Sequence, residues 1–241
     1  MVEVLLVELE GVIVETREAR RAALRDTLAT DGVTLSFAEY DDLADGISFQ
    51  QGAQAILGAR AAAPVDQTTA ELLALRAERA FMLRLGRGLL LRPGARELLE
   101  SAHGTVRLAL VTRASRRVAA FVLSLAALDD RFETIITADD VLDPKPSPEG
   151  YRTALARLNR RAALAPKRCL ALEDSVAGVR AAHAAGLRVV VVGSMPAHRA
   201  LEADASAPDL RGASAGSLYA LASGVADRLR GDPRARKARD A

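Results

Sequence analysis

Apolar and polar positions follow two different patterns along the chain. A short apolar run over Val4–Leu9 leads into a glycine and predicts a buried strand that ends in a turn. From Thr16 to about Leu91 the spacing of Arg, Glu, Ala and Leu is helical, with breaks at Asp31-Gly32, Asp45-Gly46 and Pro64. We therefore expect helices, and no strand, in that second segment.

After residue 92, short apolar strands alternate with helices. Predicted strands, rich in β-branched residues, cover residues 106–112, 134–137, 169–172 and 188–192. Predicted helices cover residues 95–103, 115–127, 148–158 and 176–185. Such alternation is typical of a parallel sheet that is covered on both faces. The predicted fold class is therefore α/β, a doubly wound parallel sheet with an all-helical insert after its first strand.

These patterns divide the chain into three parts. Residues 1–14 and 92–225 are predicted to form the α/β core domain, and residues 15–91 an inserted helical domain. Residues 226–241 hold six Arg or Lys residues against three Asp residues and are predicted to be a flexible basic tail. The body offers no basic stripe interleaved with aromatic residues, so we expect no nucleic-acid partner.

Composition limits the picture further. No apolar run reaches membrane-spanning length, so we expect no membrane partner. Cys169 is the only cysteine; this excludes an intrachain disulfide and suits a reducing, cytoplasmic location. Only three of the 33 basic residues are lysines. One of these, Lys145, stands between two prolines, which stiffen the loop and aim the side chain; the alternative is a surface lysine in a proline-rich turn.

Polar side chains gather where the predicted strands end. Glu8 and Glu10 follow the first strand, Thr112 ends the second, and Glu173 and Asp174 follow the fourth. In open parallel sheets, ligands bind at these carboxyl ends. Carboxylates there suit Mg²⁺, and a hydroxyl with a nearby cation suits a phosphate. The alternative for the acidic pair is that Asp174 or Ser175 only caps the next helix.

Taken in order, four motifs resemble those of the haloacid dehalogenase superfamily, in the subgroup of phosphoglycolate phosphatase and β-phosphoglucomutase. They are Glu8-Leu9-Glu10-Gly11-Val12, Thr112, Lys145 within DPKPSPEGY, and Glu173-Asp174-Ser175-Val176-Ala177-Gly178. The resemblance implies a Rossmann-like core with a helical cap domain, Mg²⁺ as cofactor and a small phosphorylated metabolite as substrate. We expect a monomer or a weak homodimer.

The resemblance also implies a role for each residue. Glu8 would be the nucleophile and a metal ligand, and Glu10 the acid/base and, through its main-chain carbonyl, a metal ligand. Thr112, Arg113 and Lys145 would bind the phosphate, with Thr112 and Lys145 also counted as catalytic. Glu173 and Asp174 would complete the metal site. The cap arginines Arg17, Arg20 and Arg21 are either substrate ligands or solvated helix residues.

The sequence departs from the family pattern at Glu8 and Glu10, where the family has aspartates. One extra methylene displaces a carboxylate by about 1 Å, and an error of that size can slow a reaction roughly a hundredfold. Two hypotheses stay open. The first, which we prefer, is a Mg²⁺-dependent phosphatase that is slow or impaired. The alternative is a catalytically silent protein of the same fold that binds a phosphorylated ligand or a partner.

Overall fold

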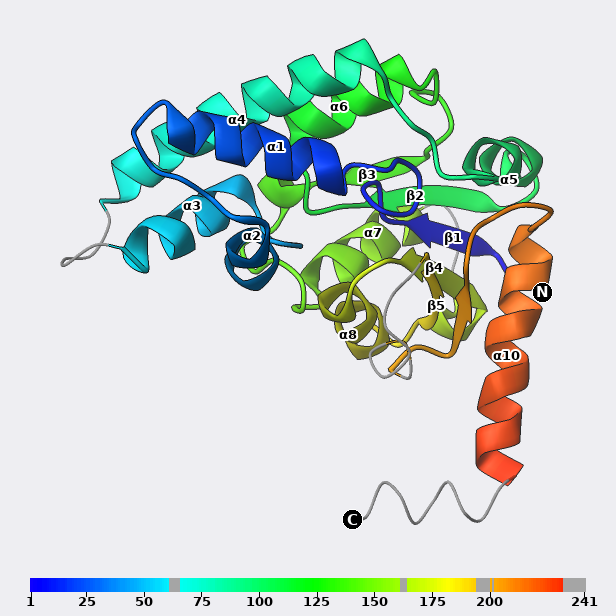
Figure 1. Ribbon diagram of the computed structural model, residues 1–241. Helices are drawn as coiled ribbons and strands as arrows, with labels where there is room; N and C mark the ends of the chain where they lie inside the picture. Colours follow the sequence, from blue (N-terminus) through cyan, green and yellow to red (C-terminus); the bar gives the residue numbers. More distant parts are fainter. Residues whose placement is uncertain (61–65, 161–163, 194–199, 201, 232–241) are drawn as a thin grey trace.

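The computed structural model in Figure 1 describes residues 1–60, 66–160, 164–193, 200 and 202–231. Within these residues, six strands form one sheet in the order β3-β2-β1-β4-β5-β6, with every neighbouring pair parallel. The strands are β1 (Val4–Val7), β2 (Arg107–Val111), β3 (Thr134–Ile136), β4 (Cys169–Glu173), β5 (Arg188–Val192) and β6 (Ala205–Ala207). The predicted parallel sheet is confirmed.

The first strand lies in the interior of this sheet. Val4 of β1 pairs with Arg107 of β2 on one side and with Cys169 of β4 on the other. Because all the strands run in the same direction, the carboxyl ends of β1, β2 and β4 meet at one edge. This register brings motifs that are far apart in the sequence to one place.

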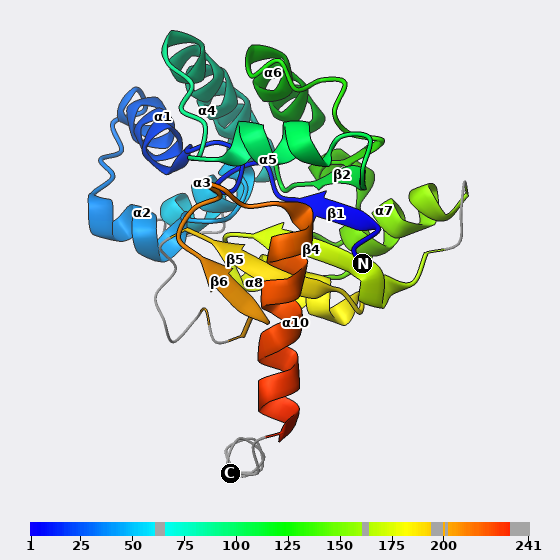
Figure 2. The same cartoon turned by 90° about the vertical axis from the view of Figure 1, so that its right-hand side faces the viewer.

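Helices cover both faces of the sheet, as Figures 1 and 2 show. Leu5 and Val7 of β1 belong to one apolar cluster, and Val4 and Leu6 belong to another. The first cluster also contains residues of α5 (Ala95–Ala102), α6 (Arg116–Leu125) and α10 (Ala215–Gly231). The second contains residues of α7 (Glu149–Asn159) and α8 (Val176–Ala184). The strand alternation therefore buries both faces, as a doubly wound sheet requires.

The described residues between β1 and α5 form helices, as expected from their spacing. These are α1 (Arg17–Ala29), α2 (Phe37–Leu43), α3 (Phe49–Gly58) and α4 (Gln67–Arg87). The two backbone segments that lead into and out of this group lie side by side, because Glu15 N donates to Leu90 O and Arg92 N donates to Ile13 O, both at 2.8 Å. The apolar cluster continues from α4 to α6, so the helical group packs onto the sheet layers without a break in the core.

The structure differs from the expectation in three places. Strand β1 ends at Val7, two residues early, and β6 was not predicted, because Ala-Ser-Ala carries no β-branched or aromatic signal. Helix α10 was not predicted either, and its end at Gly231 takes in the first six residues of the predicted tail. The predicted break at Pro64 and residues 232–241 lie outside the described residues. In the described part of the chain, no helix is long and apolar enough to cross a membrane.

Candidate active site

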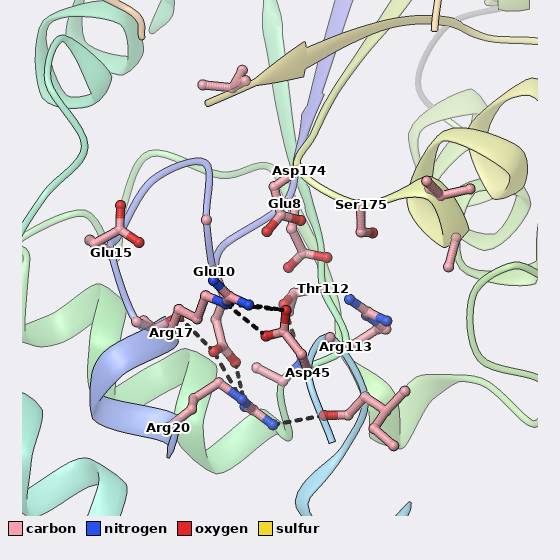
Figure 3. A pocket seen from close by; sticks show the side chains of 18 of the residues that line it. Glu8, Glu10, Glu15, Arg17, Arg20, Asp45, Thr112, Arg113, Asp174 and Ser175 are labelled. Carbon is pink, nitrogen blue, oxygen red and sulfur yellow. Dashed lines mark hydrogen bonds and ion pairs between the residues drawn. The ribbon is translucent and has the colours of Figure 1, made fainter. Parts of the chain in front are cut away.

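A cavity of about 600 Å³ lies between the carboxyl ends of β1, β2 and β4 on one side and α1 with the loop that joins α2 to α3 on the other (Figure 3). The sheet side contributes Glu8, Glu10, Gly11, Thr112, Arg113 and Asp174, and the helical side contributes Arg17, Arg20, Tyr40, Asp45 and Gly46. The structure therefore brings together five of the seven residues that were predicted to act in catalysis, phosphate binding or metal binding. Lys145 and Glu173 lie deeper, behind Glu8, and do not line the cavity.

Lys145 is buried between two carboxylates. Its Nζ donates to Glu8 Oε2 at 2.6 Å, to Glu173 Oε1 at 2.5 Å and to the carbonyl of Val111 at 2.8 Å. An ammonium has three N–H donors, and all three are used here. Glu173 accepts a further hydrogen bond from the Tyr151 hydroxyl at 2.6 Å. Lys145 is thus the counter-ion of two buried acids, and the alternative of a surface lysine is wrong.

Both oxygens of Glu8 already have protein partners. Oε1 accepts from the main-chain N–H of Leu9 at 2.8 Å, while Oε2 accepts from Lys145. Burial alone would raise the pKa of Glu8, but the charges of Lys145 and Arg113 outweigh it and hold that pKa below its ordinary value. Glu8 is therefore an ionised carboxylate at the floor of the cavity, with its side chain turned toward the Leu9 amide.

Asp174 lies against Gly11 at the wall of the cavity. Gly11 has a φ of +80°, and a Cβ at this position would overlap the Asp174 carboxylate, so only glycine fits. Burial, and after it the charges of Glu173 and Glu8, raise the pKa of Asp174 to about 8. The raised pKa means that negative charge at this point is not balanced by the protein alone.

The helix after the acidic pair begins with a serine cap. Ser175 Oγ accepts from Gly178 N at 3.1 Å, while Asp174 does not cap the helix. The capping alternative therefore applies to Ser175 and not to Asp174. A Cβ at Gly178 would overlap the Glu173 carboxylate, so this glycine lets α8 start directly above the buried acid.

Glu8 and Asp174 are the carboxylates that could hold a divalent cation. Glu173 is surrounded by its own donors, and the Glu10 side chain points toward Arg20. In the part of the chain that is described, no group of three or more His, Cys, Asp or Glu residues is arranged to hold a metal ion. Mg²⁺ is commonly held by one or two carboxylates together with waters and substrate phosphate oxygens. The unbalanced charge at Asp174 fits such a cation, with the phosphate completing its coordination.

Glu10 is bound to the helical side of the cavity. Its carboxylate lies 2.9 Å from Arg20 Nη1 and accepts from the Thr16 hydroxyl at 2.9 Å. Arg20 also donates to the carbonyl of Ile47 at 2.9 Å, and its guanidinium lies 4.2 Å from the centre of the Phe49 ring. Of the two interpretations left open for Arg20, the solvated helix residue is wrong, because its side chain is mostly buried against Glu10; the role of a substrate ligand stays a prediction.

Sequence reasoning missed part of the helical side. Arg17 lines the cavity, as one interpretation held, but Arg21 instead pairs with Glu18 and stacks on Phe37. Tyr40 and Asp45 were not singled out. The break at Asp45-Gly46 indicated a turn at this point, yet nothing in the local pattern showed which way the turn would face.

The fold and the site define a parallel α/β protein with a charged cavity at its strand ends, beneath an inserted group of helices. Residues 3–186 match the haloacid dehalogenase-like hydrolase family, and the chain belongs to that family. It is 33% identical to the protein CbbY of Cereibacter sphaeroides over 197 residues, which cover 79% of this chain and 84% of that protein. It is 30% identical to validoxylamine A 7'-phosphate phosphatase of Streptomyces hygroscopicus subsp. limoneus, over 87% of this chain and 95% of that protein.

Solved structures agree with this assignment. The crystal structure of CbbY from Rhodobacter sphaeroides in complex with phosphate superposes with a TM-score of 0.76 at 27% identity, covering 90% of this chain and 98% of that one. A CbbY mutant solved in complex with xylulose-(1,5)bisphosphate gives a TM-score of 0.75 at the same identity and coverage.

Proposed function

We propose that this protein is a Mg²⁺-dependent phosphatase of a small phosphorylated metabolite. The observation that carries the proposal is the meeting of Glu8, Thr112, Arg113 and Asp174 at the floor of one cavity. Together they offer an ionised carboxylate, a hydroxyl, a guanidinium and a site for a cation, which are the groups that phosphoryl transfer needs. Relatives named as phosphatases and a relative solved with phosphate support the same class of ligand.

In this proposal Glu8 attacks the phosphorus atom, and the ester oxygen leaves with a proton supplied by Glu10. Water then hydrolyses the resulting acyl phosphate, with Glu10 now accepting the proton. Thr112 and Arg113 hold the phosphate oxygens. Mg²⁺ at Glu8, Asp174 and the Glu10 carbonyl would neutralise the charge that gathers on the phosphate.

Lys145 has a different part in the same proposal. Since its three donors are used within the protein, it contacts the phosphate only by giving up one of those hydrogen bonds. Lys145 keeps Glu8 ionised and in place. Glu173, the second partner of Lys145, contributes by holding the ammonium group in position. Among the described residues of the cavity lining, Arg113 is the arginine without a carboxylate partner, so its guanidinium can bind an incoming phosphate.

A second candidate function is supported by a specific observation. The two carboxylates proposed for the chemistry are both engaged, Glu8 by Leu9 and Lys145, and Glu10 by Arg20 and Thr16. Both glutamates stand where the resemblance places aspartates, and both carboxylates are held by partners within the protein. The second candidate is therefore a silent member of the family that binds a phosphorylated ligand without rapid turnover.

Phosphate release from an aryl phosphate and a panel of sugar phosphates, with Mg²⁺ or with a chelator, tests the proposal. We expect Mg²⁺-dependent release that is abolished in Glu8→Gln and unchanged in the surface control Glu100→Gln. Phosphate binding without release would favour the silent candidate. If the protein neither binds phosphate nor releases it from the esters, both candidate functions are contradicted.

Two further properties belong to the proposal. We infer a cytoplasmic location, supported by the buried free thiol of Cys169, the pKa of which burial raises to about 11. We also infer a monomer or a weak homodimer, which size-exclusion chromatography over a range of concentrations would test.

A further inference from the structure

The arginines that line the cavity differ in whether a carboxylate already neutralises them. Three of the four are paired at 2.9–3.0 Å: Arg17 with Asp41 and Asp45, Arg20 with Glu10, and Arg92 with Glu15. All three lie toward the helical side or the connections that lead to it. The positive charge on that side of the cavity is therefore matched by carboxylates.

Arg113 is the exception among the described residues of the lining. It makes no hydrogen bond or ion pair there, although its charge acts on Glu8 and Asp174 at the cavity floor. The loop that joins α2 to α3 comes close to it, since a Cβ on Gly46 would lie 3.6 Å from Arg113 Nη2. The body of a ligand whose phosphate is held at Arg113 would therefore extend along that loop, where Asp45 and Arg17 line the cavity.

This distribution of charge favours one phosphate and disfavours a second. A phosphate at the helical side would find every guanidinium paired, and it would have to approach the Asp45, Glu10 and Glu15 carboxylates. Hydroxyl groups have no such difficulty, because they donate to the carboxylates and accept from the arginines. The helical side thus suits a neutral, hydroxyl-bearing group.

We propose that the ligand carries a single phosphoryl group, held at Arg113, on a neutral polyhydroxylated body, and that Asp45 is the specificity-determining residue that excludes a second phosphate. The proposal rests on the proposed function and narrows its substrate class. It separates this chain from the CbbY protein that was solved with a bisphosphate.

Asp45 is chosen because of its position and because the chain offers a matched control. Asp45 lines the cavity and Asp41 does not, yet both carboxylates lie 3.0 Å from Arg17 Nη2. Their side chains are similarly exposed, 35% and 46%. Asp45→Asn and Asp41→Asn therefore remove the same charge from the same arginine, but only the first changes the wall of the cavity.

Calorimetric titration with fructose 6-phosphate, fructose 1,6-bisphosphate and inorganic phosphate tests the proposal. Ca²⁺ replaces Mg²⁺ in these titrations, since it has the same charge and a looser coordination geometry that suits binding without turnover. We expect the wild type to bind the bisphosphate no more tightly than the monophosphate. Asp45→Asn should tighten the bisphosphate by about fivefold, the effect of one partly screened charge, and leave the monophosphate within about twofold. Asp41→Asn should change either affinity by less than about twofold.

Four outcomes would each overturn a stated part of the proposal. Bisphosphate binding that is more than about fivefold tighter in the wild type overturns the single-phosphate proposal, and an equal effect of the two Asn variants overturns the role of Asp45. If none of the three probes binds, inorganic phosphate included, then the proposed function itself fails, and this inference fails with it. An Arg113→Met variant should weaken all three probes together, whereas loss of the bisphosphate alone would contradict the placement of the phosphate at Arg113.

Discussion

Lys145 Nζ lies 2.6 Å from Glu8 Oε2, and both side chains are more than nine-tenths buried. The same ammonium lies 2.5 Å from the fully buried carboxylate of Glu173. Removing it would leave two buried acids without this counter-ion. The pair therefore bears on stability as well as on chemistry.

Lys145→Met should lower the free energy of unfolding by about 3–5 kcal/mol, because an uncompensated buried charge remains after one partner is removed. Chemical denaturation of both proteins measures the difference. Lys167→Met, at an exposed lysine, is the control and should stay within about 0.5 kcal/mol of the wild type. Equal stability of the two variants would show that the buried acids take up protons or water without penalty.

A second prediction concerns the glycine above the same acid. Gly178→Ala should destabilise the protein by about 1–3 kcal/mol, because the new methyl overlaps the Glu173 carboxylate and forces α8 or the acid to move. Gly58 also lies in a helix, but nothing comes within 4 Å of a Cβ built there. Gly58→Ala should therefore be neutral or stabilising by up to about 1 kcal/mol. Thermal or chemical unfolding of both variants measures these two changes in stability.

The third prediction is a pH dependence in protein freed of divalent cations. The pKa of Asp174 is about 8 in the folded protein against an ordinary 3.8, so between these values the folded state holds a proton that the unfolded state has lost. Stability contributed by that proton is full below about pH 4 and is lost as pH rises through 8, at up to about 1.4 kcal/mol per pH unit. Asp174→Asn should flatten this part of the profile. An unchanged slope in the variant would assign it to another group.

The fourth prediction addresses the longer carboxylates. The double variant Glu8→Asp, Glu10→Asp should hydrolyse a generic aryl phosphate at least ~10-fold faster than the wild type, about 1.4 kcal/mol of barrier. The shorter side chains withdraw from the Leu9 amide and from Arg20, while Thr112 and Arg113 stay in place. Each single variant should recover less, since nucleophile and acid/base act together.

Glu15→Asp is the matched control for that experiment, because Glu15 also lines the cavity but pairs with Arg92. It should leave the rate within about twofold of the wild type. A wild type that is already fast, with a slower double variant, would show a site adapted to glutamate. Two inert proteins that still bind phosphate would favour the silent candidate.

Much of the sheet could be predicted because its strands carry a strong local signal. The run of valines at Arg188–Val192 was assigned with the bounds that the structure has. The meeting of Glu8, Thr112 and Asp174 also followed from the sequence, since residues at the ends of neighbouring parallel strands share one edge. The short Ala205–Ala207 strand could not be found, because it forms only by pairing with β5.

The helical side of the site could not be predicted from local sequence patterns, for a different reason. Arg20 looks like any arginine on a helix, and its burial depends on Glu10, Ile47 and Phe49 arriving from three other segments. Likewise, Lys145 was recognised as unusual, yet its saturation by Glu8, Glu173 and Val111 depends on tertiary packing. Charge pairing of this kind is a property of the folded molecule rather than of any stretch of chain.

The position of β1 between β2 and β4 has a consequence for biosynthesis. Val4 can pair on one side only after Arg107 has been synthesised, and on the other side only after Cys169 has been synthesised. A nascent chain of a hundred residues therefore exposes an apolar strand with two open edges, while the helices that follow it contact one another over shorter sequence separations. Because such non-local pairing slows folding, the sheet should close only after most of the polypeptide has left the ribosome. Chaperone dependence during synthesis is the expected result, even for a native state that is stable once formed.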